Sequence, residues 1–245
     1  MILNGMPPYK DVMEPAPNST VWRYMDFPKF VYLISNSKLY FRRLDKLSDE
    51  FEGTLSLEDE KDIQKRLESL GFPMTKKLAK NISKKDVENV ENYRKYTLVN
   101  CWSQNVDESF ALWKIYLGSQ DYGIAIRTKY KKLKNSIVDN NFDMLFQKVY
   151  YAKKIKKLTQ SSVPFRKSKY YKYEREVRIA IFDRNINFNK EPQFIDGACI
   201  EVDLAKLIEE IYISPMSPSW FFDLVHHVVK EKYNFPIIKS KIKVN

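Results

Sequence analysis

Residues 173–182 of the chain read YEREVRIAIF, and this stretch is the best guide to the fold. Its charged first half is strand-like, and the apolar residues that follow at once predict that the strand runs into a buried sheet. Side chains alternate along a strand, so Glu174, Glu176 and Arg178 should share one face at steps of about 7 Å. The simplest interpretation is a charged face in solvent, whereas a place at the mouth of the sheet would make these residues a site.

Other parts of the chain carry strand signals that are interrupted by helical spacing. Runs rich in β-branched and aromatic residues predict strands at 39–44, 97–103, 123–128, 147–152, 176–182, 198–202 and 211–214, with an edge strand at 236–242. Residues 21–27 predict a short strand or the start of a helix. Apolar spacing and helix-start signals predict helices around 30–34, at 110–117, at 203–209 and from 218 to about 233. Because strands do not alternate strictly with helices, the expected class is α+β, with a mixed, largely antiparallel sheet and flanking helices.

The expected domain organisation is simple. Residues 1–20 are rich in Pro, Asn and Ser and predict an irregular N-terminal arm, and residues 21–245 predict one α+β domain. Residues 57–96 are highly charged and contain two helical patterns, the second of which begins at Ser83. We expect this segment to be a charged helical insertion, placed as a lid or an interface.

Composition narrows the classes of protein. The chain has 245 residues, 44% of them hydrophobic, with 6 Gly and a formal net charge of +11. These values indicate a folded core, and neither of the two common glycine-rich nucleotide-binding motifs occurs. The sequence starts without a secretory pattern and has no apolar run of membrane-spanning length, so a cytoplasmic protein without a membrane partner is expected. The charge fits either a lysine-rich solvated surface or attraction to a polyanion, which would require the lysines to cluster.

Cysteine and histidine are scarce. Cys101 and Cys199 lie in separate strand-like runs, and the two histidines are adjacent, at His226 and His227. Buried free thiols are the expected state of the cysteines, and this spacing argues against a Cys/His zinc site. We therefore predict no bound metal.

Four further short segments carry residues that are capable of binding or chemistry. They are Asn100–Ser103 at the end of a strand, Trp113 with Tyr116 on a helix, Trp22–Tyr24 with Arg23 at its centre, and the acidic Asp49–Glu52 loop. Each also has an ordinary structural interpretation, because serine and acidic residues cap helices and turns while aromatic residues fill cores.

In their order along the chain, these segments resemble a widespread family of bacterial and phage proteins known only as a domain of unknown function. The shared pattern is an aromatic–basic pair, an Asp-x-Phe-Glu loop, a Cys-aromatic-Ser strand, a Trp-x-x-Tyr helix and a Glu-x-Glu-x-Arg strand. It falls here on Arg23 and Tyr24; Ser48, Asp49, Phe51 and Glu52; Cys101, Trp102 and Ser103; Trp113 and Tyr116; and Glu174, Glu176 and Arg178. The resemblance spans nearly the whole chain, most loosely over 57–96, and implies no settled activity.

More distantly, the chain resembles ADP-ribosyltransferases. Those enzymes have an arginine on an early strand, a serine-containing strand, and a glutamate, often Glu-x-Glu, on a late strand. Arg23, Ser103 and the pair Glu174 and Glu176 occur in that order. Two departures are that Ser103 does not stand in a Ser-Thr-Ser motif and that Arg178 is additional. The resemblance implies NAD as a substrate, with transfer of ADP-ribose or simple NAD glycohydrolysis.

The resemblance also implies a role for each residue. Arg23 would bind the pyrophosphate of NAD through charge-assisted hydrogen bonds, and Ser103 would support the site. Glu176 would hydrogen-bond the ribose and stabilise an oxocarbenium-like centre as nicotinamide leaves, while Glu174 would activate the acceptor. The other cofactor-binding residues would be Tyr24, Trp102, Tyr116 and Arg178, with Trp102 or Tyr116 stacked on nicotinamide and Arg178 orienting the carboxylates.

Two other functions stay open on the sequence alone. In the first, Asp49, Glu52, Glu174 and Glu176 hold Mg²⁺ and the lysines bind phosphates, as in a metal-dependent nuclease or another nucleic-acid-binding effector. In the second, the chain is a non-catalytic sensor or interaction module, and 173–178 is a structural network. For the enzyme, the expected acceptor is a nucleic acid or a protein, in a bacterial or phage defence or toxin context.

Overall fold

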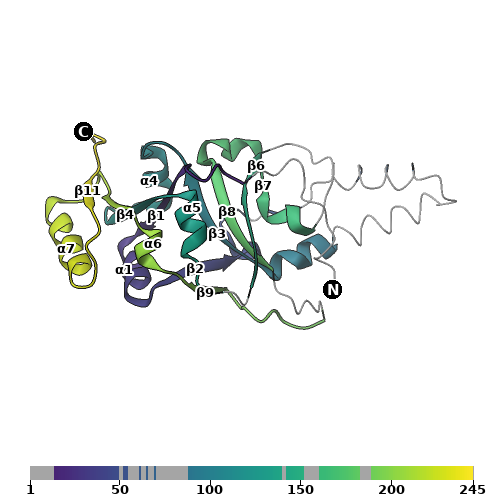
Figure 1. Ribbon diagram of the computed structural model, residues 1–245. Helices are drawn as coiled ribbons and strands as arrows, with labels where there is room; N and C mark the ends of the chain where they lie inside the picture. Colours follow the sequence, from purple (N-terminus) through teal and green to yellow (C-terminus); the bar gives the residue numbers. More distant parts are fainter. Residues whose placement is uncertain are drawn as a thin grey trace.

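A computed structural model describes residues 14–49, 52–54, 61, 65, 69, 88–139, 142–151, 160–182 and 189–244. Its main feature is a nine-stranded sheet (Figure 1). The strands are β1 (Thr20–Asp26), β2 (Lys38–Arg43), β3 (Thr97–Gln104), β4 (Gly123–Lys129), β5 (Asp143–Lys148), β8 (Glu176–Phe182), β9 (Gly197–Glu201), β10 (Glu210–Ile213) and β11 (Ile237–Lys239). A separate two-stranded sheet pairs β6 (Tyr150–Tyr151) with β7 (Arg166–Lys167).

The long central strand β3 is the branching point of the large sheet. The strands follow the order β11-β10-β4-β1-β3-β2-β9, and β8 pairs with both β3 and β5 beside this path. Every pairing in this sheet is antiparallel except that of β10 with β11, which is parallel. The predicted α+β class with a mixed, largely antiparallel sheet is therefore confirmed.

One face of the sheet carries the larger hydrophobic core. The helices on this face are α1 (Phe27–Asn36), α5 (Tyr130–Ser136), α6 (Leu204–Leu207) and α7 (Ser219–Lys230). Their buried residues, such as Leu33 of α1 and Val225 of α7, pack against alternate strand residues such as Trp102 and Val177. Burial of this apolar surface is the main stabilising term for the domain.

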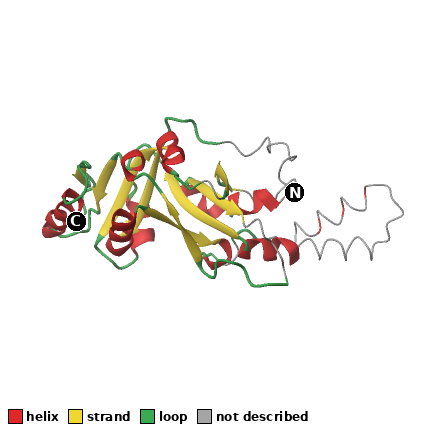
Figure 2. Cartoon of the chain, turned by 60° about the horizontal axis from the view of Figure 1, so that its bottom comes forward, coloured by secondary structure: helices red, strands yellow, loops and turns green. Residues whose placement is uncertain are grey.

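Helices pack on both sides of the sheet (Figure 2). The second face is covered at its two ends, and the residues between these ends are polar. At one end, α4 (Phe110–Leu117) packs Trp113 against Trp22 and Tyr24 of β1. The other end is covered by η1 (Leu44–Lys46), the helical residues 88–95 and η2 (Gln160–Phe165). In the register of β3 and β8, the residues of this face between the two apolar ends are Cys101, Ser103, Glu176 and Arg178.

Most predicted elements are present with small shifts of their ends. The predicted strand 147–152 is divided, because β5 ends at Lys148 and β6 begins at Tyr150. Helix α5 was not predicted, because no element was assigned between the predicted strands 123–128 and 147–152. Residues 14–19 of the expected arm are outside helices and strands, and residues 1–13 lie outside the described residues, as does most of the predicted 57–96 insertion.

The prediction that residues 173–178 form one strand is wrong. Lys169–Glu174 form the 3₁₀ helix η3, Arg175 has a left-handed conformation (φ 46°), and β8 begins only at Glu176. The reason lies in the neighbours: β3, which pairs with β8, ends one residue beyond Ser103, the partner of Glu176. Residues 173–175 therefore have almost no adjacent strand edge with which to pair.

Candidate active site at the fork of the sheet

The sheet forks along one edge of β3. There, β2 pairs with Leu98 and Val99, and β1 pairs with Ser103 and Gln104. From Arg23 onwards β1 pairs with β4 alone. The side chain of Arg23 enters the fork and donates from Nη1 to the carbonyl oxygen of Cys101 at 2.6 Å. The fork thus places a cation between two diverging strands.

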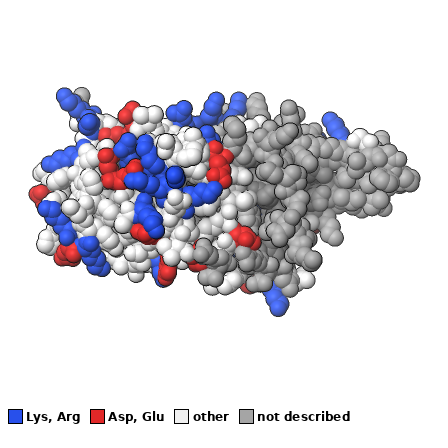
Figure 3. Space-filling model, viewed as in Figure 1, with Lys and Arg blue, Asp and Glu red and all other residues white. Residues whose placement is uncertain are grey.

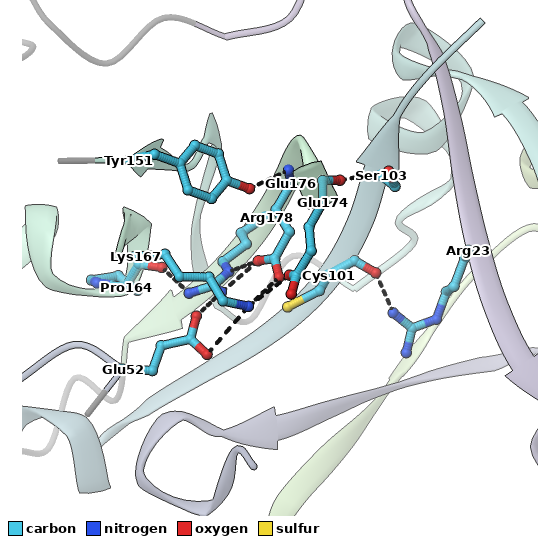
Figure 4. A network of polar contacts seen from close by, with 10 residues as sticks. All are labelled: Arg23, Glu52, Cys101, Ser103, Tyr151, Pro164, Lys167, Glu174, Glu176 and Arg178. Atoms are coloured by element: carbon cyan, nitrogen blue, oxygen red, sulfur yellow. Dashed lines mark hydrogen bonds and ion pairs between the residues drawn. The ribbon is translucent and has the colours of Figure 1, made fainter. Parts of the chain in front are cut away.

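Two glutamates meet on the other side of Cys101 (Figure 4). Glu174 is the last residue of η3, and Glu176 is the first residue of β8. The ammonium of Lys167, on β7, donates to Oε2 of Glu174 at 2.7 Å and to Oε1 of Glu176 at 2.8 Å. Glu174 and Glu176 are only 6% and 4% exposed, so their charges depend on these partners.

Arg178 and Glu52 extend this network away from the fork. Arg178 donates from Nε to Oε2 of Glu176 at 2.5 Å, from Nη1 to the carbonyl oxygen of Pro164 at 2.7 Å, and from Nη2 to Oε1 of Glu52. Glu52 reaches the network because its N–H closes a turn onto the carbonyl oxygen of Asp49 at 3.0 Å. Arg178 is fully buried and its guanidinium is engaged on all three nitrogens, so it orients the carboxylates.

Hydrogen bonds on both sides of Arg175 fix the bend between the two glutamates. Ser103 donates from Oγ to the carbonyl oxygen of Glu174 at 2.6 Å and accepts from Nδ2 of Asn105 at 2.7 Å. The N–H of Glu176 donates to the hydroxyl oxygen of Tyr151 at 2.7 Å. Ser103 therefore supports the site through the backbone, and the left-handed Arg175 is what turns both carboxylates toward Lys167.

The protonation of Glu176 is unusual for a carboxyl group. Burial, followed by the hydrogen-bonding carboxyl of Glu174, raises the pKa of Glu176 to about 8, although Lys167 acts in the opposite direction. Burial alone would lower the pKa of Lys167, but the two carboxylates outweigh it and the pKa is raised. Lys167 is therefore charged at neutral pH, while Glu176 changes its charge in a range useful for acid–base chemistry.

An aromatic residue of α4 lies at the same place. Tyr116 is 37% exposed, and its ring stacks on Tyr24 with centroids 6.0 Å apart and an interplanar angle of 18°. Burial, and next the charge of Glu176, raises the pKa of the Tyr116 phenol. The same causes in the same order raise the pKa of the Cys101 thiol. The positive charge of Arg23 acts on both groups in the opposite direction and lowers their pKa values.

The structure brings most predicted site residues together. Arg23, Ser103, Glu174 and Glu176 lie on or beside the three neighbouring strands β1, β3 and β8. Tyr24 of β1 stacks on Tyr116 of α4. Trp102 is not among them: it lies on the opposite face of β3, 1% exposed, and donates from Nε1 to Asn100. This corrects its expected stacking role, because alternation along β3 turns it away from Cys101 and Ser103.

The expected placement of Arg178 on the cofactor is also corrected, since its buried guanidinium leaves no contact surface for a dinucleotide.

Sequence reasoning missed Lys167 and Tyr151. Lys167 is one of many lysines in the sequence, and no spacing rule singles it out. Tyr151 was predicted to lie in a strand, but its contact with Glu176 was not predicted. Their positions depend on the small β6–β7 sheet, which pairs Tyr151 with Lys167.

The network leaves little room for a bound metal. Lys167 Nζ lies 3.8 Å from Oε2 of Glu52 in addition to its contacts with the two other glutamates, so an ammonium occupies the centre of three carboxylates. Within the described part of the chain, no group of three or more His, Cys, Asp or Glu residues is arranged to hold a metal ion.

Among the residues that the structure describes, no helix is both long and apolar enough to cross a membrane.

Comparisons with known proteins give a weak likeness to solved structures. No family model matches the chain, and no curated protein matches its sequence. DarT from Thermus sp. 2.9 in complex with NAD⁺ has a TM-score of 0.42 and 8% identity, covering 94% of this chain and 98% of that one. The complex of that DarT with ADP-ribosylated single-stranded DNA gives 0.41 and 10%, over 94% and 98%. At TM-scores below 0.5 this likeness supports no assignment of function.

Proposed function

We propose that the chain binds NAD⁺ at the fork and cleaves the bond between nicotinamide and ribose. The observation that carries this proposal is the convergence of Arg23 and the Glu174–Glu176 pair on the two sides of Cys101 (Figure 4). Tyr116 is near enough for the charges of Glu176 and Arg23 to act on its phenol. One cation, one exposed aromatic ring and two carboxylates are what a dinucleotide with a pyrophosphate, a nicotinamide ring and a reacting ribose requires. The chain would be an ADP-ribosyltransferase, or an NAD glycohydrolase when water is the acceptor.

Each residue has a role that its contacts permit. Within the described residues, the side chain of Arg23 makes one hydrogen bond, to Cys101, so its other N–H groups are available to pyrophosphate oxygens. Tyr116 offers a ring face for nicotinamide, with Tyr24 behind it. Ionised Glu176 stabilises the positive charge that develops on the ribose.

The proposed reaction balances as a simple substitution. The C1′–N bond breaks with its electron pair on nicotinamide, which leaves as a neutral molecule. The acceptor hydroxyl or amine, or water, forms the new bond to C1′, and its proton passes to the carboxylate of Glu174 and then to solvent. Both glutamates therefore act, Glu176 on the cation and Glu174 on the incoming nucleophile.

For the acceptor, the surface next to Glu174 favours a nucleic acid. Tyr170 and Tyr173 of η3 are 76% and 52% exposed, and Lys169, Lys172 and Arg175 are exposed on the same segment. Exposed aromatic rings stack on bases and nearby cations contact phosphates, as single-stranded nucleic acids require. The family resemblance adds a bacterial or phage defence or toxin context to the proposal.

The decisive experiment compares Glu176→Gln with the wild type and with Glu201→Gln, an exposed glutamate of β9. Release of nicotinamide from NAD⁺ should fall roughly 10²–10⁴-fold in Glu176→Gln and stay unchanged in Glu201→Gln. Thermal unfolding would establish that both variants are folded. If the wild type releases no nicotinamide with water, nucleic acid or lysate protein as acceptor, the proposal is wrong and a binding module becomes the better interpretation.

A second test concerns the cation in the fork. Arg23→Gln should raise KM for NAD⁺ about 10- to 100-fold, because a charged hydrogen bond to pyrophosphate is lost. Arg42→Gln, at an exposed position of β2, is the matched control and should behave like the wild type. An unchanged KM in a folded Arg23→Gln protein would show that Arg23 does not bind the pyrophosphate.

A further inference from the structure

We propose that Lys167 is a positioning residue of this site: its ammonium holds Glu174 and Glu176 side by side and favours the ionised form of Glu176. This inference rests on the proposed function where it concerns the reaction, but the state of the glutamates can be measured without NAD⁺. Among the described residues, Lys167 bonds to the glutamates and makes no hydrogen bond to Arg23 or Tyr116. Its effect on chemistry must therefore act through the carboxylates.

The geometry of Lys167 is that of a bridge between two acids. One nitrogen makes bonds of 2.7 and 2.8 Å to two different glutamates, and the residue is only 8% exposed. The ring of Tyr171 covers the ammonium, with 4.8 Å from Nζ to the ring centroid. A side chain with four rotatable bonds loses much conformational freedom in such a place, so the contacts must outweigh that cost.

The small β6–β7 sheet positions Lys167 and also supports Glu176. β7 pairs in parallel with β6, which places Tyr151 directly opposite Lys167. The hydroxyl oxygen of Tyr151 accepts from the N–H of Glu176, while Lys167 bonds to its carboxylate. Arg166, the preceding residue of β7, donates from Nη1 to the carbonyl oxygen of Thr54 at 3.3 Å, next to the Glu52 turn. The β6–β7 sheet thus contacts Glu176 through Tyr151 and Lys167, and it contacts the Glu52 turn through Arg166.

The charges in the network explain why one ammonium matters. Glu52, Glu174 and Glu176 carry three negative charges when ionised, and Lys167 and Arg178 carry two positive charges. The formal sum is −1, and it becomes −2 when the lysine is replaced by a neutral residue. A buried excess of negative charge is relieved by protonation of a carboxylate, which would remove the charge from Glu176.

No other described group near Glu176 can replace the missing charge. The cations Arg23 and Arg178 are already charged at neutral pH and have their own partners. The phenols and the thiol that face the site have raised pKa values and stay neutral. The described ionisable groups in and beside this network are Arg23 on β1, Asp49 and Glu52 after η1, Cys101 on β3, Tyr116 on α4, Tyr151 on β6, Lys167 on β7, Tyr171, Tyr173 and Glu174 on η3, and Arg178 on β8. Arg175, between η3 and β8, is exposed and donates to Oδ1 of Asn105.

The first arm of the test measures Glu176 directly. Full-length protein labelled with ¹³C at the glutamate carboxyl carbons is titrated by NMR without NAD⁺, with Glu176→Gln identifying the resonance. In Lys167→Met, which keeps the length and loses the charge, the midpoint of Glu176 should move up by at least about one pH unit. Lys167→Arg should stay near the wild type, and Lys230→Met, at an exposed lysine of α7, should match it. An unmoved midpoint in Lys167→Met overturns the proposal.

The second arm measures nicotinamide release as a function of pH. A midpoint that is higher by one pH unit lowers the ionised fraction about tenfold at pH values below it, so Lys167→Met should lose about tenfold in kcat at pH 7 and recover at high pH. KM for NAD⁺ should change little, because Lys167 bonds to neither Arg23 nor Tyr116. A moved NMR midpoint without any wild-type NAD⁺ cleavage would reject the proposed function and leave the effect of Lys167 on Glu176 standing.

If Lys167→Met does not fold, Lys167→Gln takes its place, because glutamine still donates hydrogen bonds but carries no charge. It is titrated in the same way, and the titration midpoint of Glu176 should rise as expected for Lys167→Met. The wild type supplies a further check through the ¹⁵N resonance of the Lys167 ammonium. This group must stay protonated from pH 6 to pH 9, and a neutral Lys167 within that range contradicts the proposal.

Discussion

At the scale of single residues, Glu176 is defined by the groups that bind it. Its carboxylate accepts from Lys167 and Arg178, its N–H donates to Tyr151, and its partner across β3 is Ser103. These contacts hold the carboxylate in one orientation, which reactions at a positioned ribose require. Burial nevertheless favours the protonated form of Glu176, whereas the contact with Lys167 favours the ionised form.

This balance has a consequence for stability. The pKa of Glu176 rises from its ordinary value of 4.5 to about 8 on folding, so the folded state binds the proton more tightly than the unfolded state. The contribution of Glu176 to stability should therefore fall as pH rises from about 4.5 to about 8. Glu176→Gln stays neutral, so the Tm difference, wild type minus variant, should be smaller at pH 8 than at pH 5. Thermal unfolding at both values tests this, and a difference that grows with pH would contradict it.

How far the sequence predicts the site depends on the kind of residue. Arg23, Ser103, Glu174 and Glu176 could be found because a resemblance orders them along the chain. Trp102 could not be placed, because alternation shows that it faces away from Ser103 but not which face of β3 bears the site. Lys167 could not be found at all, since its role depends on tertiary contacts that no local pattern records.

At the scale of elements, η3 is where the sequence and the structure differ most. Its residues have the composition of a strand, with three tyrosines, yet they form a 3₁₀ helix because the neighbouring strand β3 ends beside them. Strand propensity depends on an available neighbour, so tertiary context decided the conformation here. The β-branched and aromatic residues of β3, β4 and β8 predicted those strands well, because each strand is buried in the sheet with neighbours on both edges.

The exposure of η3 leads to a prediction about the acceptor. Replacing Tyr170 and Tyr173 together by serine should lower transfer of ADP-ribose to single-stranded nucleic acid at least about tenfold, since stacking contributes roughly 1–3 kcal/mol per base. Release of nicotinamide with water as acceptor should be unchanged. Tyr32→Ser, at an exposed tyrosine of α1, is the control. Equal loss of both activities would mean that η3 supports the glutamates and does not bind the acceptor.

At the scale of the whole molecule, the formal net charge is +11, and the places where the cations gather decide what the surface can attract. Lysines and arginines gather in the middle of the face seen in Figure 3, with acidic residues directly beside them. On α5, Lys132 pairs with Glu209 at 2.7 Å and Lys134 pairs with Glu14 at 2.9 Å. These two lysines are thus neutralised locally, which makes α5 a weaker phosphate-binding surface than its sequence indicates.

Salt dependence distinguishes a local from a global basic surface. If Lys169, Lys172 and Arg175 make the phosphate contacts, log K for a single strand should fall against log salt with a slope of roughly −2, or roughly 20-fold between 50 and 200 mM. Fluorescence anisotropy with a labelled oligonucleotide measures this slope. A slope near zero would exclude a nucleic-acid acceptor, and a slope steeper than about −5 would mean that α5 and other basic segments also bind.

The ammonium at the centre of Glu52, Glu174 and Glu176 also determines what the protein needs from its surroundings. A cation that belongs to the chain has no dissociation constant and cannot be removed by a chelator or exchanged for a competing ion. This cation is therefore in place as soon as the chain has folded. The contacts between this cation and the three carboxylates would therefore not change with the concentration of free Mg²⁺ or Ca²⁺.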